Sequence, residues 1–287
     1  MNLFDWENDM SQQLRGKIAV VTGAARGQGR SHAVRLAQEG ADIVAMDLCD
    51  DVPGTPYPGA TEADLHETVR LVEETGSRIV ARKADVRDLA QVRAVVDEGV
   101  DVFGGLDIVA ANAGVTVDPA VVEDIEEDIW RNVIDINLNG VFRTVKASIP
   151  HLRANPDGGS IVLTGSTAAT RGFPNVADYT ASKHGVTGLM RSLALELGQY
   201  NIRVNSINPT QVDTDMIQHD AYYRLFNPHL AAPTREDFAE ASSAVHVLPV
   251  PWVESVDVSN ALVFLVSDQA RYITGAALPV DAGRNLR

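Results

Sequence analysis

The chain has 287 residues, 45% of them hydrophobic, a formal net charge of −15 and a single cysteine, Cys49. This composition allows a sizeable buried core, while the acidic balance argues against nucleic acid or an anionic membrane as a partner. A lone cysteine excludes an internal disulfide and fits a reducing compartment, so we expect a cytoplasmic protein. The acidic N-terminus is unlike a signal peptide, and no run of roughly 18 apolar residues predicts a membrane span.

The first predicted unit is a strand, a glycine-rich turn and a helix. Residues 17–22 are mostly apolar, the turn carries Gly23, Gly27 and Gly29, and helical apolar spacing then runs to Gly40. Glycines allow a tight turn and a close approach of ligand to backbone. A helix N-terminus offers unpaired N–H groups to a pyrophosphate. This order of elements therefore predicts a dinucleotide site.

The next predicted strand, residues 41–46, ends at Asp47. A carboxylate at this place can accept hydrogen bonds from both ribose hydroxyls and repels a 2′-phosphate, which favours NAD over NADP. Residues 49–60 follow, with three prolines and two glycines, and predict a loop. Connections between a strand and a helix usually take roughly 2 to 6 residues, so this length suggests a function. A tolerated surface insertion is an equally good alternative.

Helices and strands are predicted to alternate along the whole chain. The predicted helices cover residues 30–37, 62–75, 89–103 and 125–153, and the predicted strands cover residues 17–22, 41–46, 78–84, 106–110, 161–165 and 202–208. No repeat or linker divides them. We therefore predict an α/β fold: a single-domain, doubly wound (Rossmann) parallel sheet with helices on both faces, in residues 14–287, preceded by an N-terminal extension in residues 1–13.

The chemistry is predicted to lie between Ser166 and Lys183. Tyr179 and Lys183 are four residues apart at the start of a helical pattern, so their side chains share one helix face. Free tyrosine has a pKa of about 10, and one close cation lowers a pKa by roughly 1 to 3 units. Lys183 is thus suited to make Tyr179 a base. Ser166 follows a predicted buried strand, at whose carboxyl end open α/β sheets bind ligands.

The glycine spacing G-x-x-x-G-x-G and the thirteen-residue interval between Ser166 and Tyr179 resemble those of the short-chain dehydrogenase/reductase family. The resemblance extends from about residue 14 to the C-terminus. It implies that Tyr179 exchanges a proton with the substrate, Ser166 orients the substrate oxygen and Lys183 holds the ribose. Asn137 matches the family's asparagine that holds a water for proton relay.

The resemblance also implies a set of cofactor contacts. A basic residue at the position of Arg26 can favour NADP in this family, but a 2′-phosphate would still meet Asp47, so we predict NAD. Thr210 replaces the glycine of the family's Pro-Gly pair, which we expect to restrain the loop beside the nicotinamide. The predicted cofactor-binding residues are Gly23, Arg26, Gly27, Gln28, Gly29, Asp47, Leu48, Asp85, Val86, Asn112, Ala113, Gly114, Tyr179, Lys183, Pro209, Thr210, Val212 and Thr214.

Aromatic residues broken by prolines mark residues 213–252, which the resemblance implies to be a substrate lid. This composition predicts cyclic or bulky apolar secondary alcohols, terpenoid- or steroid-like, rather than sugars or charged acids. Residues 49–60 and 248–254 resemble the mycofactocin-associated, carveol dehydrogenase-like subgroup, whose NAD is held too firmly to exchange. That implies reoxidation by a mycofactocin-type electron carrier, and the family resemblance implies a homotetramer.

We predict an NAD-dependent enzyme that interconverts a secondary alcohol and its ketone. One alternative is a non-catalytic NAD-binding sensor or scaffold, which has no need for Asn137, Ser166, Tyr179 and Lys183 together. The other is a lyase or epimerase that uses bound NAD transiently and shows no net cofactor reduction. The seven histidines are scattered and no metal-binding motif is present, so we expect no metal site.

Overall fold

The computed structural model describes residues 12–287. Seven parallel strands form one sheet in the order β3-β2-β1-β4-β5-β6-β7. They are β1 (Ile18–Thr22), β2 (Asp42–Asp47), β3 (Ile79–Lys83), β4 (Ile108–Ala111), β5 (Gly159–Thr164), β6 (Ile202–Pro209) and β7 (Ala277–Val280). The inner strands are runs of buried apolar residues, as in a sheet covered on both faces.

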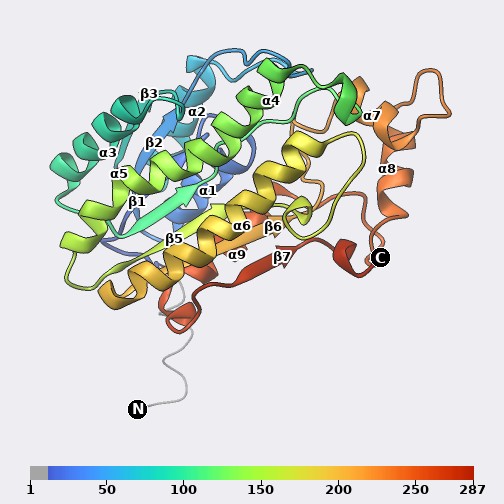
Figure 1. Ribbon diagram of the computed structural model, residues 1–287. Helices are drawn as coiled ribbons and strands as arrows, with labels where there is room; N and C mark the ends of the chain where they lie inside the picture. The colour runs from blue at the N-terminus through green and yellow to red at the C-terminus, as the bar shows by residue number, and fades with distance from the viewer. Residues whose placement is uncertain (1–11) are drawn as a thin grey trace.

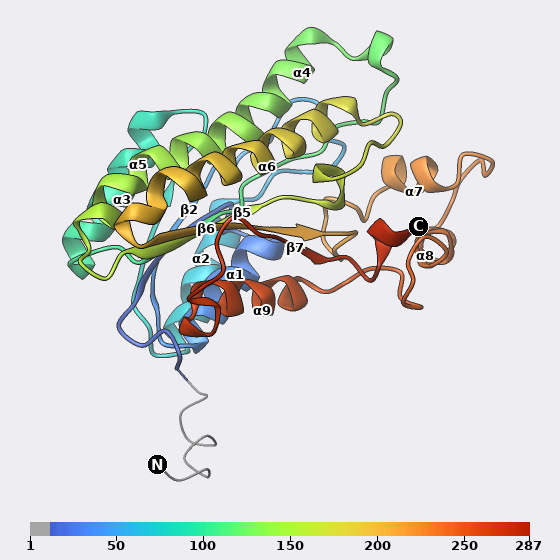
Figure 2. The ribbon, with the colours of Figure 1, turned by 60° about the horizontal axis from the view of Figure 1, so that its bottom comes forward.

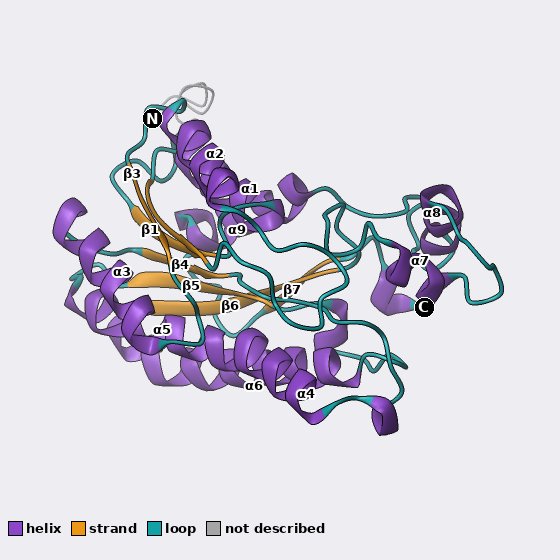
Figure 3. Ribbon diagram, turned by 90° about the horizontal axis from the view of Figure 1, so that it is seen from above, coloured by secondary structure: helices purple, strands orange, loops and turns teal. Residues whose placement is uncertain are grey.

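Helices cover both faces of this sheet. They are α1 (Gly27–Gln38), α2 (Glu62–Glu73), α3 (Leu89–Phe103), α4 (Glu127–Ile134), α5 (Val141–Ala154), α6 (Ala177–Leu197), α7 (Asp220–Phe226), α8 (Arg235–Ser243) and α9 (Ser255–Val266). Figure 1 and Figure 3 place α1, α2 and α9 on one face and α3, α5 and α6 on the other. The predicted single-domain, doubly wound fold is confirmed. Among residues 12–287, no helix is long and apolar enough to span a membrane.

The strand order reverses at β1, which pairs with β2 on one side and β4 on the other. In open α/β sheets, ligands bind beyond the carboxyl ends of the strands at such a reversal. The turns that follow β1, β2 and β4 therefore face a common crevice. Figure 2 shows that α7, α8 and the C-terminus lie together beyond this same edge of the sheet, outside the two helical layers.

One long helix over residues 125–153 was expected, and this prediction is wrong at its centre. A wider π-helical turn, η2 (Asp135–Gly140), separates α4 from α5. Asn137, in that turn, is fully buried, and its side chain accepts a hydrogen bond from Val115 N at 2.8 Å and donates one to Val115 O at 2.9 Å. These two hydrogen bonds to the segment after β4 stabilise the irregular turn. Such turns are frequent at functional sites.

Gln12 and Gln13 are hydrogen-bonded to the body of the domain. The backbone N–H groups of Gln12 and Gln13 donate to the Glu39 carboxylate at 3.2 and 3.1 Å, so these two residues of the predicted extension contact the domain. The rest of the extension, residues 1–11, lies outside the described residues.

In the layer formed by α1 and α9, buried His32 Nδ1 lies 2.8 Å from Ser259 Oγ.

Candidate active site

A cavity of about 520 Å³ opens at the carboxyl ends of the strands. All the predicted cofactor contacts line it, and so does Ser166. Asn137 is the one predicted site residue that does not, because it lies fully buried behind the wall. The structure therefore brings together residues from nearly the whole chain around one space.

The glycine turn after β1 packs too closely to admit side chains. Gly23 has a φ of +65°, and a Cβ on Gly29 would lie 1.8 Å from the Gly23 carbonyl oxygen. No side chain caps the N-terminus of α1 with a hydrogen bond, so its first N–H groups remain available to an anion. Gln28 Oε1, also lining the cavity, is buried without a hydrogen-bond partner. These features fit a dinucleotide pyrophosphate and its surroundings.

Asp47 is held at the end of β2 by backbone groups. Its Oδ2 accepts from Ala25 N at 2.9 Å and its Oδ1 accepts from Cys49 N at 3.1 Å. The carboxylate thus joins the glycine turn to the start of the loop at residues 49–60 and faces the cavity. This is the position in which a carboxylate can meet the adenosine ribose.

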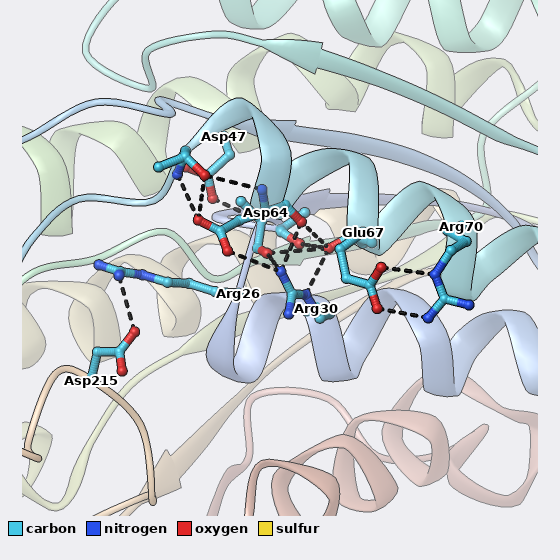
Figure 4. Close-up of polar contacts among 11 residues, drawn as sticks. Arg26, Arg30, Asp47, Asp64, Glu67, Arg70 and Asp215 are labelled. Atoms are coloured by element: carbon cyan, nitrogen blue, oxygen red, sulfur yellow. Dashed lines mark hydrogen bonds and ion pairs between the residues drawn. The ribbon is translucent and has the colours of Figure 1, made fainter.

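Arg26 is engaged by protein groups. Its Nη1 lies 3.0 Å from Asp215 Oδ2, its Nη2 donates to Pro58 O, and its guanidinium carbon lies 5.7 Å from the Tyr57 ring centroid. Figure 4 shows the pair with Asp215. An arginine neutralised in this way attracts a 2′-phosphate less strongly. The argument for NADP from Arg26 is correspondingly weakened.

The loop at residues 49–60 is a wall of the cavity rather than a surface insertion. Tyr57 lines the cavity, and its hydroxyl oxygen accepts from Thr116 N at 3.2 Å. Its ring lies 5.5 Å from the ring of His219, in the predicted lid. Within the loop, Gly59 N donates to Asp51 Oδ1 at 2.7 Å. The loop therefore reaches from the ribose end to the substrate end.

Tyr179 and Lys183 lie on the first turns of α6, as their spacing predicted. Lys183 Nζ lies 5.5 Å from the Tyr179 ring centroid and donates to Thr164 O, at the end of β5, at 2.8 Å. Gly114 leaves the space beside the amine open, because a Cβ there would lie 3.6 Å from Lys183 Nζ and 3.4 Å from Asn137 Oδ1. Asn137, Gly114 and Lys183 thus meet at one point.

The electrostatics of this pair differ from the expectation. Burial raises the pKa of Tyr179 to about 12, although a hydrogen bond from Ser166 opposes the rise. Burial also lowers the pKa of Lys183 to about 8. The sequence predicts that Lys183 lowers the pKa of Tyr179, whereas in the structure the largest influence on that pKa is the loss of water around the phenol, which raises it.

The predicted lid divides into pocket wall and core. Tyr222, Leu225 and Phe226 of α7 line the cavity. Phe238 of α8 is fully buried, and its ring packs 5.7 Å from that of Trp252. Aromatic composition alone could not distinguish these two roles, because both require apolar surface.

Thr210 lies where the family has glycine, and it ties the end of β6 to the predicted lid. Its Oγ1 lies 2.8 Å from Nε2 of buried His246, whose Nδ1 donates to Val250 O at 2.7 Å. This agrees with the expectation of a restrained loop. Sequence reasoning did not single out several other residues that line the cavity, among them Thr116, Phe173 and Arg284, and it gave Tyr57 and Asp215 no individual role.

Half-buried Tyr179 and buried Lys183 lie beside a dinucleotide site at the point where the strand order of a doubly wound parallel sheet reverses. This is the arrangement of a dinucleotide-dependent oxidoreductase. Residues 23–285 match a family model described as enoyl-(acyl carrier protein) reductase. The chain is 54% identical to (−)-trans-carveol dehydrogenase of Rhodococcus erythropolis over 275 residues, 96% of this chain and 99% of that protein.

Two crystal structures with NAD are also similar to the chain. Carveol dehydrogenase from Mycobacterium avium in complex with NAD gives a TM-score of 0.95 at 52% identity, over 96% of this chain and 100% of that one. A short chain dehydrogenase from Mycobacterium paratuberculosis bound to NAD gives 0.88 at 44% identity, over 96% and 100%. The chain belongs to the short-chain dehydrogenase/reductase family, and the predictions of an oxidoreductase and of NAD as cofactor are confirmed.

Proposed function

We propose that the protein interconverts a secondary alcohol and its ketone, with Tyr179 exchanging a proton with the substrate oxygen. The observation that carries the proposal is the position of Tyr179, which lies half-buried beside Ser166 and Lys183 in the same cavity as the dinucleotide site. When bound, NAD supplies the hydride chemistry. The relatives named for alcohol dehydrogenation support this reaction class.

The side chains then have separate tasks. At a pKa of about 12, Tyr179 keeps its proton at neutral pH and is ready to give it to a ketone oxygen. In the oxidising direction Tyr179 must first lose that proton, which its raised pKa makes costly near pH 7. Positive charge from Lys183 and from the bound cofactor would offset part of this cost. Ser166 would orient the substrate oxygen.

Asn137 has a more indirect task than the family pattern suggested. Both ends of its amide are bonded to the Val115 backbone, so its side chain holds the segment that carries Gly114 beside Lys183. We assign it this positioning task in the proton relay. A relay water would then contact backbone groups of the π-helical turn.

Tight retention of NAD belongs to the same proposal. The loop at residues 49–60, the glycine turn and the segment after β6 meet at Arg26, over the cavity mouth. A closed wall of this kind slows release, and proline stiffening reduces the entropy lost on ordering it. An NAD that does not leave needs an electron carrier that reaches it in place, and we propose one of the mycofactocin type.

The retention proposal has a direct test. Protein purified without added cofactor and passed through gel filtration is expected to contain near-stoichiometric nicotinamide, and shortening residues 49–60 to a minimal turn should release it. Cofactor-free protein that cycles readily on added NAD would exclude tight retention and leave the dehydrogenase assignment intact.

The cavity walls favour an apolar, cyclic substrate of the terpenoid or steroid type. Apolar residues from four segments line its outer part: Val117, Phe173, Val176, Ile217, Tyr222, Leu225, Phe226 and Val245. We take residues 213–252 as the substrate lid. The test is a panel of secondary alcohols, with terpenoids, steroids and sugars, assayed with NAD alone and with an artificial electron acceptor.

The outcomes of this panel separate the alternatives. Turnover of cyclic alcohols with the acceptor, and little with NAD alone, supports the proposal. Bound NAD without turnover of any alcohol would favour a sensor or scaffold. Conversion of substrate without net cofactor reduction would favour a lyase or epimerase.

A homotetramer in the cytoplasm completes the proposal. Large apolar side chains are exposed on the outer helical layer, with Phe142 of α5 at 45% and Leu195 of α6 at 86%. Large apolar side chains exposed on a helical layer are often covered by another subunit. The single cysteine supports a reducing compartment. Light scattering after gel filtration measures the oligomeric state.

A further inference from the structure

Arg284 brings a guanidinium to the cavity from outside the predicted lid. It begins the C-terminal turn η6 (Arg284–Leu286), which lies beside the end of α8 (Figures 1 and 2). Its guanidinium carbon lies 5.4 Å from the ring centroid of Phe173, and both residues line the cavity. The cavity wall therefore contains a cation beside the aromatic ring of Phe173.

No acidic side chain neutralises this cation within residues 12–287. Asp281, one turn earlier, uses its carboxylate to accept from Gly283 N at 2.9 Å and Asn285 N at 3.0 Å. The charged group that acts on Arg284 most strongly is another cation, Arg171. Burial and Arg171 together lower the pKa of Arg284. A half-buried cation next to a like charge is costly unless something compensates it.

The Arg171 side chain bonds to the backbone of the C-terminal turn η6. Its Nη1 donates to Arg284 O at 3.1 Å and to Arg287 O, and its guanidinium carbon lies 5.3 Å from the Phe173 ring centroid. Phe173 thus contacts two guanidinium groups. This arrangement fixes the backbone of Arg284 while leaving its side-chain donors without a hydrogen-bond partner among the described residues.

A second donor accompanies Arg284. The Tyr222 hydroxyl has no hydrogen-bond partner in the described chain, although its ring is packed 5.6 Å from that of Phe238 and 5.5 Å from that of Phe226. Tyr222 is close enough to both Tyr179 and Arg284 for their charges to act on its pKa, which burial raises. Tyr222 therefore connects the catalytic end of the cavity with the Arg284 end.

We infer that Arg284 and Tyr222 bind a carboxylate carried by the substrate, on the side of its ring away from the reacting hydroxyl. A guanidinium presents a planar fork of N–H donors that matches a carboxylate, and a phenol adds a third donor. The apolar walls would hold the ring between the two ends. The substrate class is then an alicyclic hydroxy acid. This inference rests on the proposed interconversion of a secondary alcohol and its ketone. It replaces the fully apolar substrate with one that carries a carboxylate, and so departs from the expectation that charged acids are disfavoured.

The test compares three cyclohexanols with isosteric groups at the 4-position: isopropyl, carboxamide and carboxylate. The wild-type protein should favour the carboxylate over the isopropyl compound by at least about tenfold in kcat/KM. Arg284→Met should lower kcat/KM for the carboxylate by about 10- to 100-fold, mainly through KM, because this remote contact is the same before and during the reaction. The isopropyl compound should change less than about threefold. Arg224→Met, which removes an exposed arginine of α7 paired with Asp220, is the matched control.

The inference fails if the wild-type protein shows no preference for the carboxylate, or if Arg284→Met lowers kcat/KM equally for all three substrates. Arg284→Lys keeps the charge without the fork and should lose only part of the preference. Titration of the NAD-containing protein with cyclohexanecarboxylate, which has no hydroxyl to oxidise, decides the matter independently of turnover. Saturable binding to the wild-type protein that Arg284→Met abolishes supports the inference, even if no alcohol is oxidised. The absence of oxidation would then contradict the proposed function and leave the carboxylate site supported. Equal binding by both proteins would refute the inference.

Discussion

Arg26 and Asp215 are 189 residues apart in the chain, yet their side chains form an ion pair with 3.0 Å between Nη1 and Oδ2. Arg26 immediately precedes α1, and Asp215 follows Thr214 on the other side of the cavity. The Arg26 side chain also donates to Pro58 O in the loop at residues 49–60. One guanidinium thus joins three segments that surround the dinucleotide site.

Asp215→Asn is expected to speed the release of NAD by about two- to fivefold, because the Asp215 side chain is largely exposed and such pairs contribute roughly 0.2 to 1 kcal/mol. Arg26→Ala removes the pair, the bond to Pro58 and the contact with Tyr57, so its effect should be larger. Release is measured by stopped-flow displacement of the bound cofactor. Asp220→Asn, in the exposed pair with Arg224, is the control. Unchanged release in both variants would show that Arg26 does not close the site.

Tyr179→Phe is expected to lower turnover by roughly 100- to 10,000-fold while leaving NAD content unchanged, because only the proton-exchanging hydroxyl is lost. Tyr200→Phe, in the exposed turn η4 (Gly198–Tyr200) that follows α6, should retain normal turnover. Initial rates on an accepted alcohol and the nicotinamide content of each purified variant are the measurements. A Tyr179→Phe enzyme with a near-normal rate would remove Tyr179 from the chemistry.

Asp47→Ser is expected to weaken the binding of NAD and to reduce the discrimination against NADP by about tenfold or more. The carboxylate both accepts hydrogen bonds from the ribose and repels a 2′-phosphate, and serine does only the former. Dissociation constants for both cofactors, measured on cofactor-stripped protein, provide the comparison. Since Arg26 is already paired with Asp215, Asp47→Ser should not bind NADP more tightly than the wild type binds NAD. A wild type that prefers NADP would overturn this account of Asp47.

His32 predicts a pH dependence of stability. Burial between α1 and α9 lowers its pKa from 6.5 to about 3, so the folded protein holds this ring neutral while the unfolded chain protonates it below pH 6.5. Its contribution is fully present above pH 6.5 and is lost progressively as the pH falls towards 3. Between pH 6.5 and 5 the loss is about 2 kcal/mol in the free energy of unfolding.

The measurement is denaturant unfolding at pH 7, 6 and 5 for the wild type and His32→Gln. His32→Gln is less stable at pH 7 but should show a smaller decline on acidification, because glutamine does not titrate. Exposed His66→Gln should retain the wild-type slope. Parallel slopes for wild type and His32→Gln would mean that another group controls acid sensitivity.

Much of this protein is encoded in local sequence patterns. Gly23 and Gly29 predict the turn because no side chain fits there, and Asp47 predicts the cofactor because it ends a strand beside that turn. The spacing of Tyr179 and Lys183 predicts a shared helix face because a helix repeats every 3.6 residues. Alternating apolar strands and amphipathic helices predict the sheet and its two helical layers.

Other features depend on segments that are distant in the chain, and only the tertiary structure decided them. Asn137 lies in a π-helical turn and bonds to the Val115 backbone, a contact that no periodic pattern in the sequence predicts. The pKa of Tyr179 rises because folding removes water from around the phenol. Arg26 meets Asp215, and Arg284 enters the cavity, only when the chain closes around the site. Local sequence determines the shape of each element, while burial and charge at the site arise from the packing of all of them together.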